Sequence, residues 1–274
     1  MTHATESWVH VETSLCRASA AARRPSVLGV VLLFMMQPGK YEPVFALGST
    51  LDWITWLISS QWDGFKHFGY QSLGLFYNGT SATHLSGDEM TERLGLHGIG
   101  SRIGSSADCT RILGALRGSS DVVFYSTKNG IEYDRLGNHA ITVEAPQAVA
   151  AAQDVQFRVG DILLVRTGFH HPMKHVGVES SRAMAKWLWD TGFSACASDA
   201  PAFEAIPKRS IDIEDLFLHE IMLAGWGMPI GELWELEKLS EHCAQTKRYS
   251  FFMTSMPLHV VGGVGSPSNA IAIF

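Results

Sequence analysis

"GDILLVRTG", residues 160–168, is a short apolar run between two glycines, which predicts a buried strand. The segment that follows, "ESSRAMAKWLWDTG" (179–192), spaces its apolar residues along one helical face. One of its two adjacent serines would cap this helix, and Gly192 would end it. "FSACASDAP" (193–201) then predicts a second strand that runs into a turn.

Further elements are expected on both sides of this unit. "NHAITVE" (138–144) alternates and predicts a strand, and "SIDIEDLFLHEIMLAGWGMP" (210–229) predicts a helix ended by glycines and a proline. "GELWELEKLSEHCAQ" (231–245) predicts another helix with Glu232 in its first turn. The last stretch, 257–274, reads as a strand, a glycine-rich loop and a strand. Mixed helices and strands indicate an α/β or α+β domain.

Composition limits the classes of function. The chain has 274 residues and a net charge of −6, and it shows no basic stripe, which argues against a nucleic-acid partner. Its four cysteines lie far apart without a C-x-x-C pair, as expected of reduced thiols in a cytoplasmic protein. The apolar run 27–36 is shorter than the roughly 20 residues of a membrane-spanning helix, so we expect a buried strand or short helix there and no membrane partner.

Two weak spacings carry possible chemistry. In "SSQWDGFKHFGY" (59–70), Asp63 and His67 stand four residues apart, and they either share a helix face or flank a tight turn at Gly64. Both residue types ligate metals, and histidine is also the usual proton shuttle near neutral pH. The ordinary alternative is a half-buried loop in which Asp63 caps a turn and His67 is hydrogen-bonded.

The second spacing joins His219 and Glu232 across the turn "GWGMPIG", which could bring both side chains to one point. The ordinary alternative makes Glu232 a charge at a helix N-terminus and His219 a surface residue. A third group of histidines, in "HHPMKH" (170–175), reads as a solvated loop. The chain contains neither a phosphate-binding glycine motif nor a G-x-S-x-G nucleophile elbow.

Several blocks taken together resemble one family. They include "SSQWDGFKHFGY", "WLWDTGFSACASDAPAFEA" and "LHEIMLAGWGMPIGELWELEKLSEHC", and they are similar to the cyclase family that contains kynurenine formamidase and isatin hydrolase, most of all to its fungal branch. The resemblance implies a single α/β domain of the swivelling β/β/α type over 51–274, with a mixed sheet and flanking helices. Residues 1–50 would form an irregular N-terminal segment and 101–125 an atypical insert, through divergence or retained intron sequence.

Bacterial members of this family bind one or two divalent metals through the motif H-x-G-T-H-x-D-x-P-x-H. On this chain the aspartate of the motif falls on Asp63, and its last histidine, the proposed proton donor and acceptor, falls on His67. The first two histidines fall on Leu57 and Gln61, of which leucine cannot ligate and glutamine offers only a neutral oxygen. The resemblance therefore implies His67 as the catalytic residue.

The later ligand pair of the family resembles His219 and Glu232 in this chain. The implied metal ligands are thus mostly oxygen, which suits one divalent metal, Mn or Zn, with Mg²⁺ also compatible. The implied ligands are Asp63, His219, Glu232 and Gln61, and the implied substrate-binding residues are Trp62, Phe65, Tyr70 and Asp199.

The resemblance implies a metal-dependent hydrolase that cleaves a C–N bond of a small cyclic or linear amide, such as an arylformamide of tryptophan catabolism or a lactam. One alternative is a cyclase or dehydratase of fungal secondary metabolism on the same scaffold. Another is a degenerate homologue without catalysis, because two ligand histidines are replaced. The expected partner is a small-molecule substrate, and the resemblance also allows a homodimer.

Overall fold

The structure of this chain is a computed structural model that describes residues 8–10, 60–65, 67–81, 111–113, 129–130, 139–168, 176–205, 217–255, 257 and 265–274. Leu57, the apolar run 27–36 and the histidine-rich loop 170–175 lie outside these residues. Predictions made for those three segments therefore stay predictions.

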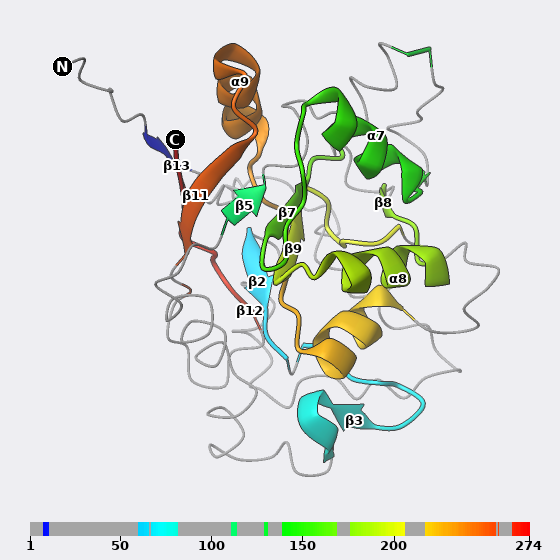
Figure 1. Ribbon diagram of the computed structural model, residues 1–274. Coiled ribbons are helices and arrows are strands. Elements are labelled where there is room, and N and C mark those ends of the chain that lie inside the picture. Colours follow the sequence, from blue (N-terminus) through cyan, green and yellow to red (C-terminus); the bar gives the residue numbers. More distant parts are fainter. Residues whose placement is uncertain are drawn as a thin grey trace, which may run out of the picture.

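A nine-stranded sheet forms the centre of the molecule (Figure 1). Its strands follow the order β1-β13-β11-β5-β7-β9-β10-β2-β12. The run from β5 to β10 is parallel, and the pairs on either side of it are antiparallel. This mixed sheet with helices confirms the predicted α/β class. The strands are β1 (Trp8–His10), β2 (Gln61–Asp63), β5 (Arg111–Leu113), β7 (Ile162–Val165), β9 (Ala195–Ser198), β10 (Ile230–Glu232), β11 (Ser250–Ser255), β12 (Gly265–Ser266) and β13 (Ala270–Ile273).

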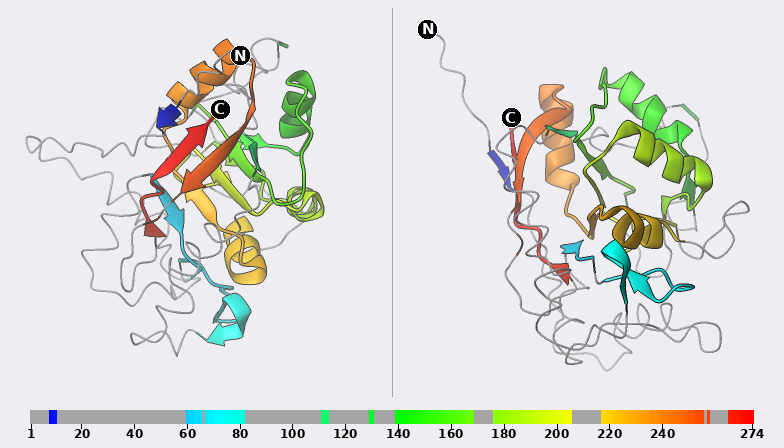
Figure 2. Two further views of the ribbon diagram at one scale, coloured as in Figure 1. Left: turned by 60° about the vertical axis from the view of Figure 1, so that its left-hand side comes forward. Right: turned by 60° about the horizontal axis from the view of Figure 1, so that its bottom comes forward.

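Helices flank this sheet, and α7 and α8 lie together on one side of it, away from β11 and β13 (Figure 2). Two small sheets pair β3 with β4 and β6 with β8, and both β3 and the adjoining 3-10 helix η1 pack on the π-helix η3. No helix in the described part of the chain is long and apolar enough to cross a membrane. The remaining elements are η1 (Tyr77–Gly79), α7 (Glu144–Ala152), α8 (Arg182–Thr191), η3 (Glu220–Trp226), α9 (Glu237–Thr246), β3 (Leu75–Phe76), β4 (Thr80–Ser81), β6 (Ala140–Ile141) and β8 (Gly177–Val178).

Local sequence signals explain the central strand–helix–strand unit. All four residues of β7 are buried, as the unbroken apolar run predicts. Helix α8 is capped by Ser181, whose hydroxyl accepts a hydrogen bond from the Met184 N–H, and it ends at Gly192 in the left-handed region with φ 75°. The predicted strand at 193–201 is also confirmed, since β9 lies within it and is fully buried.

The predicted helix at 231–245 is wrong at its start. Glu232 ends strand β10, and helix α9 begins only at Glu237. Strand β10 pairs with β9 on one side and β2 on the other, so that sheet pairing satisfies its backbone groups. Gly231 permits this close packing, because a Cβ there would lie 2.6 Å from the Cβ of Ala197. At Gly231 and Glu232, pairing with β9 and β2 therefore outweighs the local preference for a helix that continues into α9.

Other boundaries differ as well. The strand predicted at 138–144 is confined to β6, and α7 begins at Glu144, an element that the sequence reading did not assign. Pro146 is tolerated there because it stands in the first helical turn. Helix η3 ends at Gly227 with φ 64°, as predicted for 210–229, of which residues 210–216 lie outside the described residues.

The segment 1–50, predicted to be irregular, and the predicted atypical insert 101–125 each include a strand of the main sheet, and the domain bounds stay a prediction. Strand β1 comes from the segment 1–50 and pairs with β13, and β5 comes from 101–125 and lies between β11 and β7. The described parts of both segments are therefore integrated into the sheet.

Candidate metal centre

Strand β2 and the turn after it deliver the first two side chains of the site. Because side chains alternate along a strand, Gln61 and Asp63 share one face of β2 and Trp62 points to the other. After Gly64 the chain turns back, and the His67 N–H donates to the Gly64 carbonyl at 2.8 Å. Asp63 and His67 thus flank a tight turn, which is one of the two geometries that their spacing allowed. Their Oδ1 and Nε2 atoms lie 4.0 Å apart.

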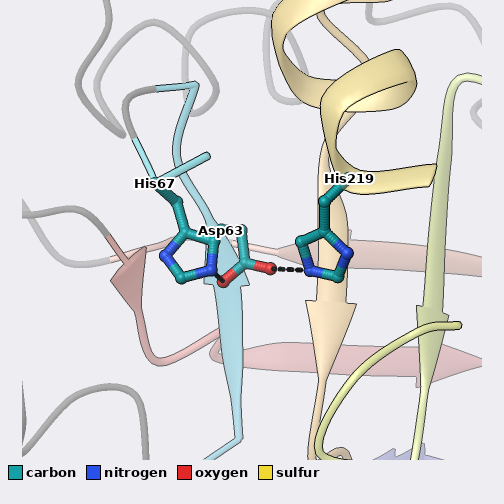
Figure 3. Close-up of side chains that lie close together, drawn as sticks. All are labelled: Asp63, His67 and His219. Atoms are coloured by element: carbon teal, nitrogen blue, oxygen red, sulfur yellow. Dashed lines mark ion pairs between the residues drawn. The ribbon is translucent and has the colours of Figure 1, made fainter. Parts of the chain in front are cut away.

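His219 and Glu232 meet Asp63 from two other elements. His219 directly precedes η3, and its Nε2 lies 3.7 Å from Asp63 Oδ2 and 3.0 Å from Glu232 Oε1. Glu232 ends β10, where it is paired in register with Gln61 of β2. Figure 3 shows the imidazoles of His67 and His219 on either side of the Asp63 carboxylate. The structure therefore brings Asp63, His219 and Glu232 together, as the resemblance to the cyclase family implies.

The cluster has the donor set of a cation site. One potential ligand atom from each of Asp63, His67 and His219 lies within 4.8 Å of the others, and all three side chains are buried. Asp63 Oδ2 and His67 Nε2 are also buried without a hydrogen bond within the described structure, whereas His219 Nε2 is paired with Glu232 Oε1. Such atoms are rare in folded proteins because burial removes their water without compensation. Carboxylate oxygen and imidazole nitrogen fit a divalent metal such as Mn²⁺ or Zn²⁺.

Burial also dominates the electrostatics. Desolvation raises the pKa of Asp63 well above its usual value, the charge of Glu232 raises it further, and His219 partly opposes both. For His67, desolvation and then the charge of His219 lower the pKa to about 3, so that its imidazole is neutral at neutral pH. A cation bound among these groups would offset the free energy lost by burying the charged carboxylates.

Gln61 lies inside the site, as its predicted role requires. Its side-chain Nε2 donates to Asp63 Oδ1 at 3.1 Å and lies 3.5 Å from Glu232 Oε2. The amide nitrogen therefore faces both carboxylates in this structure, whereas ligation would need the amide oxygen. Its role as a ligand stays a prediction.

Glu204 is a site residue that the sequence reading missed. Its carboxylate is fully buried, with Oε2 2.6 Å from His219 Nδ1 and Oε1 accepting from the His219 backbone N–H at 3.2 Å. Burial raises the pKa of Glu204, but the charge and hydrogen bonds of His219 outweigh it and leave that pKa lowered. For His219, burial lowers the pKa, but Glu204 and Glu232 raise it well above its usual value. The segment "DAPAFEA" carries no spacing that relates it to His219.

The aromatic residues predicted to bind substrate divide into two groups. Trp62 faces away from the cluster: its Nε1 donates to Ser255 Oγ at 2.8 Å, and its ring meets that of Trp234 edge-on, with centroids 4.8 Å apart. The structure therefore does not bring Trp62 to the site. Phe68, which the sequence places in the same block, does reach it, because its ring centroid lies 6.3 Å from that of His67 and 5.6 Å from that of His219.

Phe65 and Tyr70 contact η1 and η3, respectively. The Phe65 ring is buried against Tyr77 with centroids 4.9 Å apart, and the Tyr70 hydroxyl approaches the backbone of η3 at Gly225. Burial, and then the charge of Glu220, raise the pKa of Tyr70. For both residues, substrate binding stays a prediction.

Asp199 joins the carboxyl ends of β7 and β9. Its Oδ1 accepts hydrogen bonds from the Thr167 N–H and hydroxyl, and its Oδ2 accepts from the Gly168 N–H, at 2.6 to 2.9 Å. These bonds engage both carboxylate oxygens in holding the loop after β7. Its predicted contact with substrate stays a prediction.

Comparisons with known proteins agree with this fold. The family described as "Putative cyclase" matches residues 119–205, which include β7, α8, β9 and Glu204. A solved structure, described as a novel cyclase, is 27% identical with a TM-score of 0.62, covering 79% of this chain and 69% of its own. Residues 119–205 of this chain thus match the cyclase family, and its fold resembles that of the novel cyclase structure. The predicted fungal branch stays a prediction.

Two isatin hydrolases are also similar in structure. One, bound to the product analogue thioisatinate, is 14% identical with a TM-score of 0.43 and 60% coverage of each chain. The other, isatin hydrolase A from Ralstonia solanacearum, is 14% identical with a TM-score of 0.42, covering 93% of this chain and 99% of its own. No protein of curated function matches. Asp63, His219 and Glu232 lie outside the range matched by the family model, so their roles rest on geometry.

Proposed function

We propose that this chain is a metal-dependent hydrolase that cleaves the C–N bond of a small cyclic or linear amide, of the arylformamide or lactam type. The observation that carries the proposal is the buried cluster of Asp63, His67 and His219, in which Asp63 Oδ2 and His67 Nε2 lack hydrogen bonds. An ordinary core would pair these atoms, because each unpaired group costs free energy.

Asp63, His219 and Glu232 would hold one divalent metal, Mn or Zn, and the Gln61 side chain lies close enough to assist. When bound, such a metal polarises a carbonyl and lowers the pKa of a bound water. Because Glu204 engages Nδ1 of His219, the Nε2 of that ring is left to face the ligand position.

His67 is the proposed proton shuttle. Its Nε2 is buried without a hydrogen bond beside Asp63, and this nitrogen would take a proton from the attacking water and return it to the leaving nitrogen. The turn at Gly64 fixes its position relative to Asp63. Phe68, beside both imidazoles, supplies an apolar surface suited to an aromatic acyl or amine group.

The variant His67→Gln tests this assignment. We expect it to retain metal and to lose roughly 100- to 10,000-fold in kcat on formanilide or isatin, because proton transfer is removed and the ligands are kept. Metal content and turnover are measured on the same preparation. Wild-type turnover that persists after complete chelation contradicts the proposed function.

Cyclisation is the second candidate, because the structure that matches at 27% identity is described as a cyclase. The same residues would serve it, with an internal nucleophile in place of water. Metal uptake without hydrolysis across a panel of arylformamides and lactams favours this reaction. A folded chain that takes up neither Mn²⁺ nor Zn²⁺ favours the non-catalytic homologue.

A further inference from the structure

We propose that the segment Phe203–Ala205 is a positioning clamp that sets the affinity of the site for metal, and that Gly177 holds this clamp in place. The inference rests on the proposed metal site and extends it to residues that would not touch the metal. It follows from the hydrogen bonds that Phe203 and Glu204 make to two different proposed ligands, Glu232 and His219.

Glu204 contacts His219 through both of its carboxylate oxygens. Oε2 lies 2.6 Å from the ring Nδ1, and Oε1 accepts the backbone N–H of the same residue. The first contact fixes the rotation of the ring, and the second fixes the start of the helix that carries it. Together they determine where Nε2 points.

Phe203 forms a hydrogen bond with the second proposed ligand, Glu232. Its backbone N–H donates to Glu232 Oε1 at 3.1 Å, and this is the oxygen that lies 3.0 Å from His219 Nε2. Because Phe203 and Glu204 are neighbours, a shift of this segment moves His219 and Glu232 together.

Strand β8 holds the segment in turn. The Val178 N–H donates to the Phe203 carbonyl, and the Ala205 N–H donates to the Val178 carbonyl, each at 2.9 Å. Gly177 precedes Val178 and lies against the backbone of Glu204. A Cβ at Gly177 would lie 2.4 Å from the carbonyl carbon of Glu204 and 2.6 Å from the Ala205 nitrogen.

These contacts predict that Gly177 influences the affinity for metal indirectly, through the position of Glu204. Backbone atoms cannot swing aside as the end of a side chain can, so Gly177→Ala must displace Glu204. Glu204→Gln acts directly, because an amide has one acceptor oxygen for the two His219 donors. Both substitutions should weaken metal binding by about 10- to 100-fold, as loss of a residue that orients a ligand does.

The experiment is calorimetric titration of the metal-free full chain with MnCl₂ and, separately, ZnCl₂. It compares the wild type with Glu204→Gln and Gly177→Ala. Asp161→Asn and Gly160→Ala serve as matched controls, because they precede β7 at the opposite end of the strand from the site. Asp161 is a buried carboxyl that accepts from the Arg158 N–H, and Gly160 has φ 90°, so that alanine there strains the backbone at a place remote from the site. Circular dichroism verifies that each variant is folded.

We expect Kd to rise at least 10-fold in both clamp variants and to stay within twofold in both controls. The Nδ1–H signal of His219 in ¹H–¹⁵N spectra of the zinc-loaded protein should also shift in Glu204→Gln. Kd values within twofold of wild type in folded clamp variants overturn the inference and leave the metal site standing. A wild type that binds neither metal overturns the proposed function as well. If Gly177→Ala does not fold, Glu204→Gln decides the outcome, since it preserves volume.

Discussion

At the scale of single residues, Asp63 is a candidate metal ligand that lowers the stability of the folded protein. Its carboxylate is fully buried beside Glu232, and burial is the largest cause of its raised pKa. A carboxyl whose pKa is raised on folding destabilises the protein at pH values above its unfolded pKa, including neutral pH. Such a residue is unfavourable to stability and favourable to cation binding.

The substitution Asp63→Asn separates these two effects. In the presence of a chelator we expect the variant to be as stable as the wild type or more stable, by up to about 2 kcal/mol, because a buried charge is removed. Its affinity for Mn²⁺ should fall at least about 100-fold. Urea unfolding with chelator and with excess Mn²⁺ measures both quantities. A large loss of stability in chelator would show that Asp63 is structural.

Sequence patterns predicted the elements whose signals are local. The apolar run of β7, and the serine cap and glycine stop of α8, lie within the segments they define. Strand β10 could not be predicted in this way, since its three residues are held by β9 and β2 from distant parts of the chain. Glu204 was missed for the same reason, because only the fold brings it to His219.

Strand β10 also yields a prediction. In Gly231→Ala the added Cβ would lie 2.6 Å from Ala197 Cβ and 2.7 Å from the Trp234 Nε1. We expect the free energy of unfolding to fall by about 1–3 kcal/mol and Mn²⁺ affinity to fall as well, because Glu232 is the next residue.

The control for this variant is Ser181→Ala, which removes the cap of α8 away from the site. It should lower the free energy of unfolding by about 1 kcal/mol and leave Mn²⁺ affinity unchanged. Equal effects of the two substitutions on metal affinity would contradict a specific role for β10.

At the scale of the whole molecule, the site joins parts that are remote in sequence. Its residues come from β2 and the following turn, from the start of η3 and from the end of β10. The resemblance to the cyclase family predicted that His219 and Glu232 lie near Asp63. No pattern in the sequence predicted the order of the nine strands. Non-local pairing of this kind depends on packing across the entire sheet.

A metal held by these elements should stabilise the fold as a unit. At a Mn²⁺ concentration of 100 times Kd, the expected gain is about 2.7 kcal/mol. For a chain of this size that corresponds to a rise in Tm of roughly 5–10 °C, reversed by chelator. Differential scanning calorimetry measures it, and a Tm that is independent of metal would contradict binding to the folded state.

The most direct test of the central claim is elemental analysis of the purified wild type beside Asp63→Ala and His219→Ala. The two residues come from β2 and the start of η3 and meet only through the fold. If they form one metal site, the wild type carries about one equivalent of Mn or Zn, and both variants lose it. A wild type without metal, even after addition of Mn²⁺ or Zn²⁺, would contradict the claim.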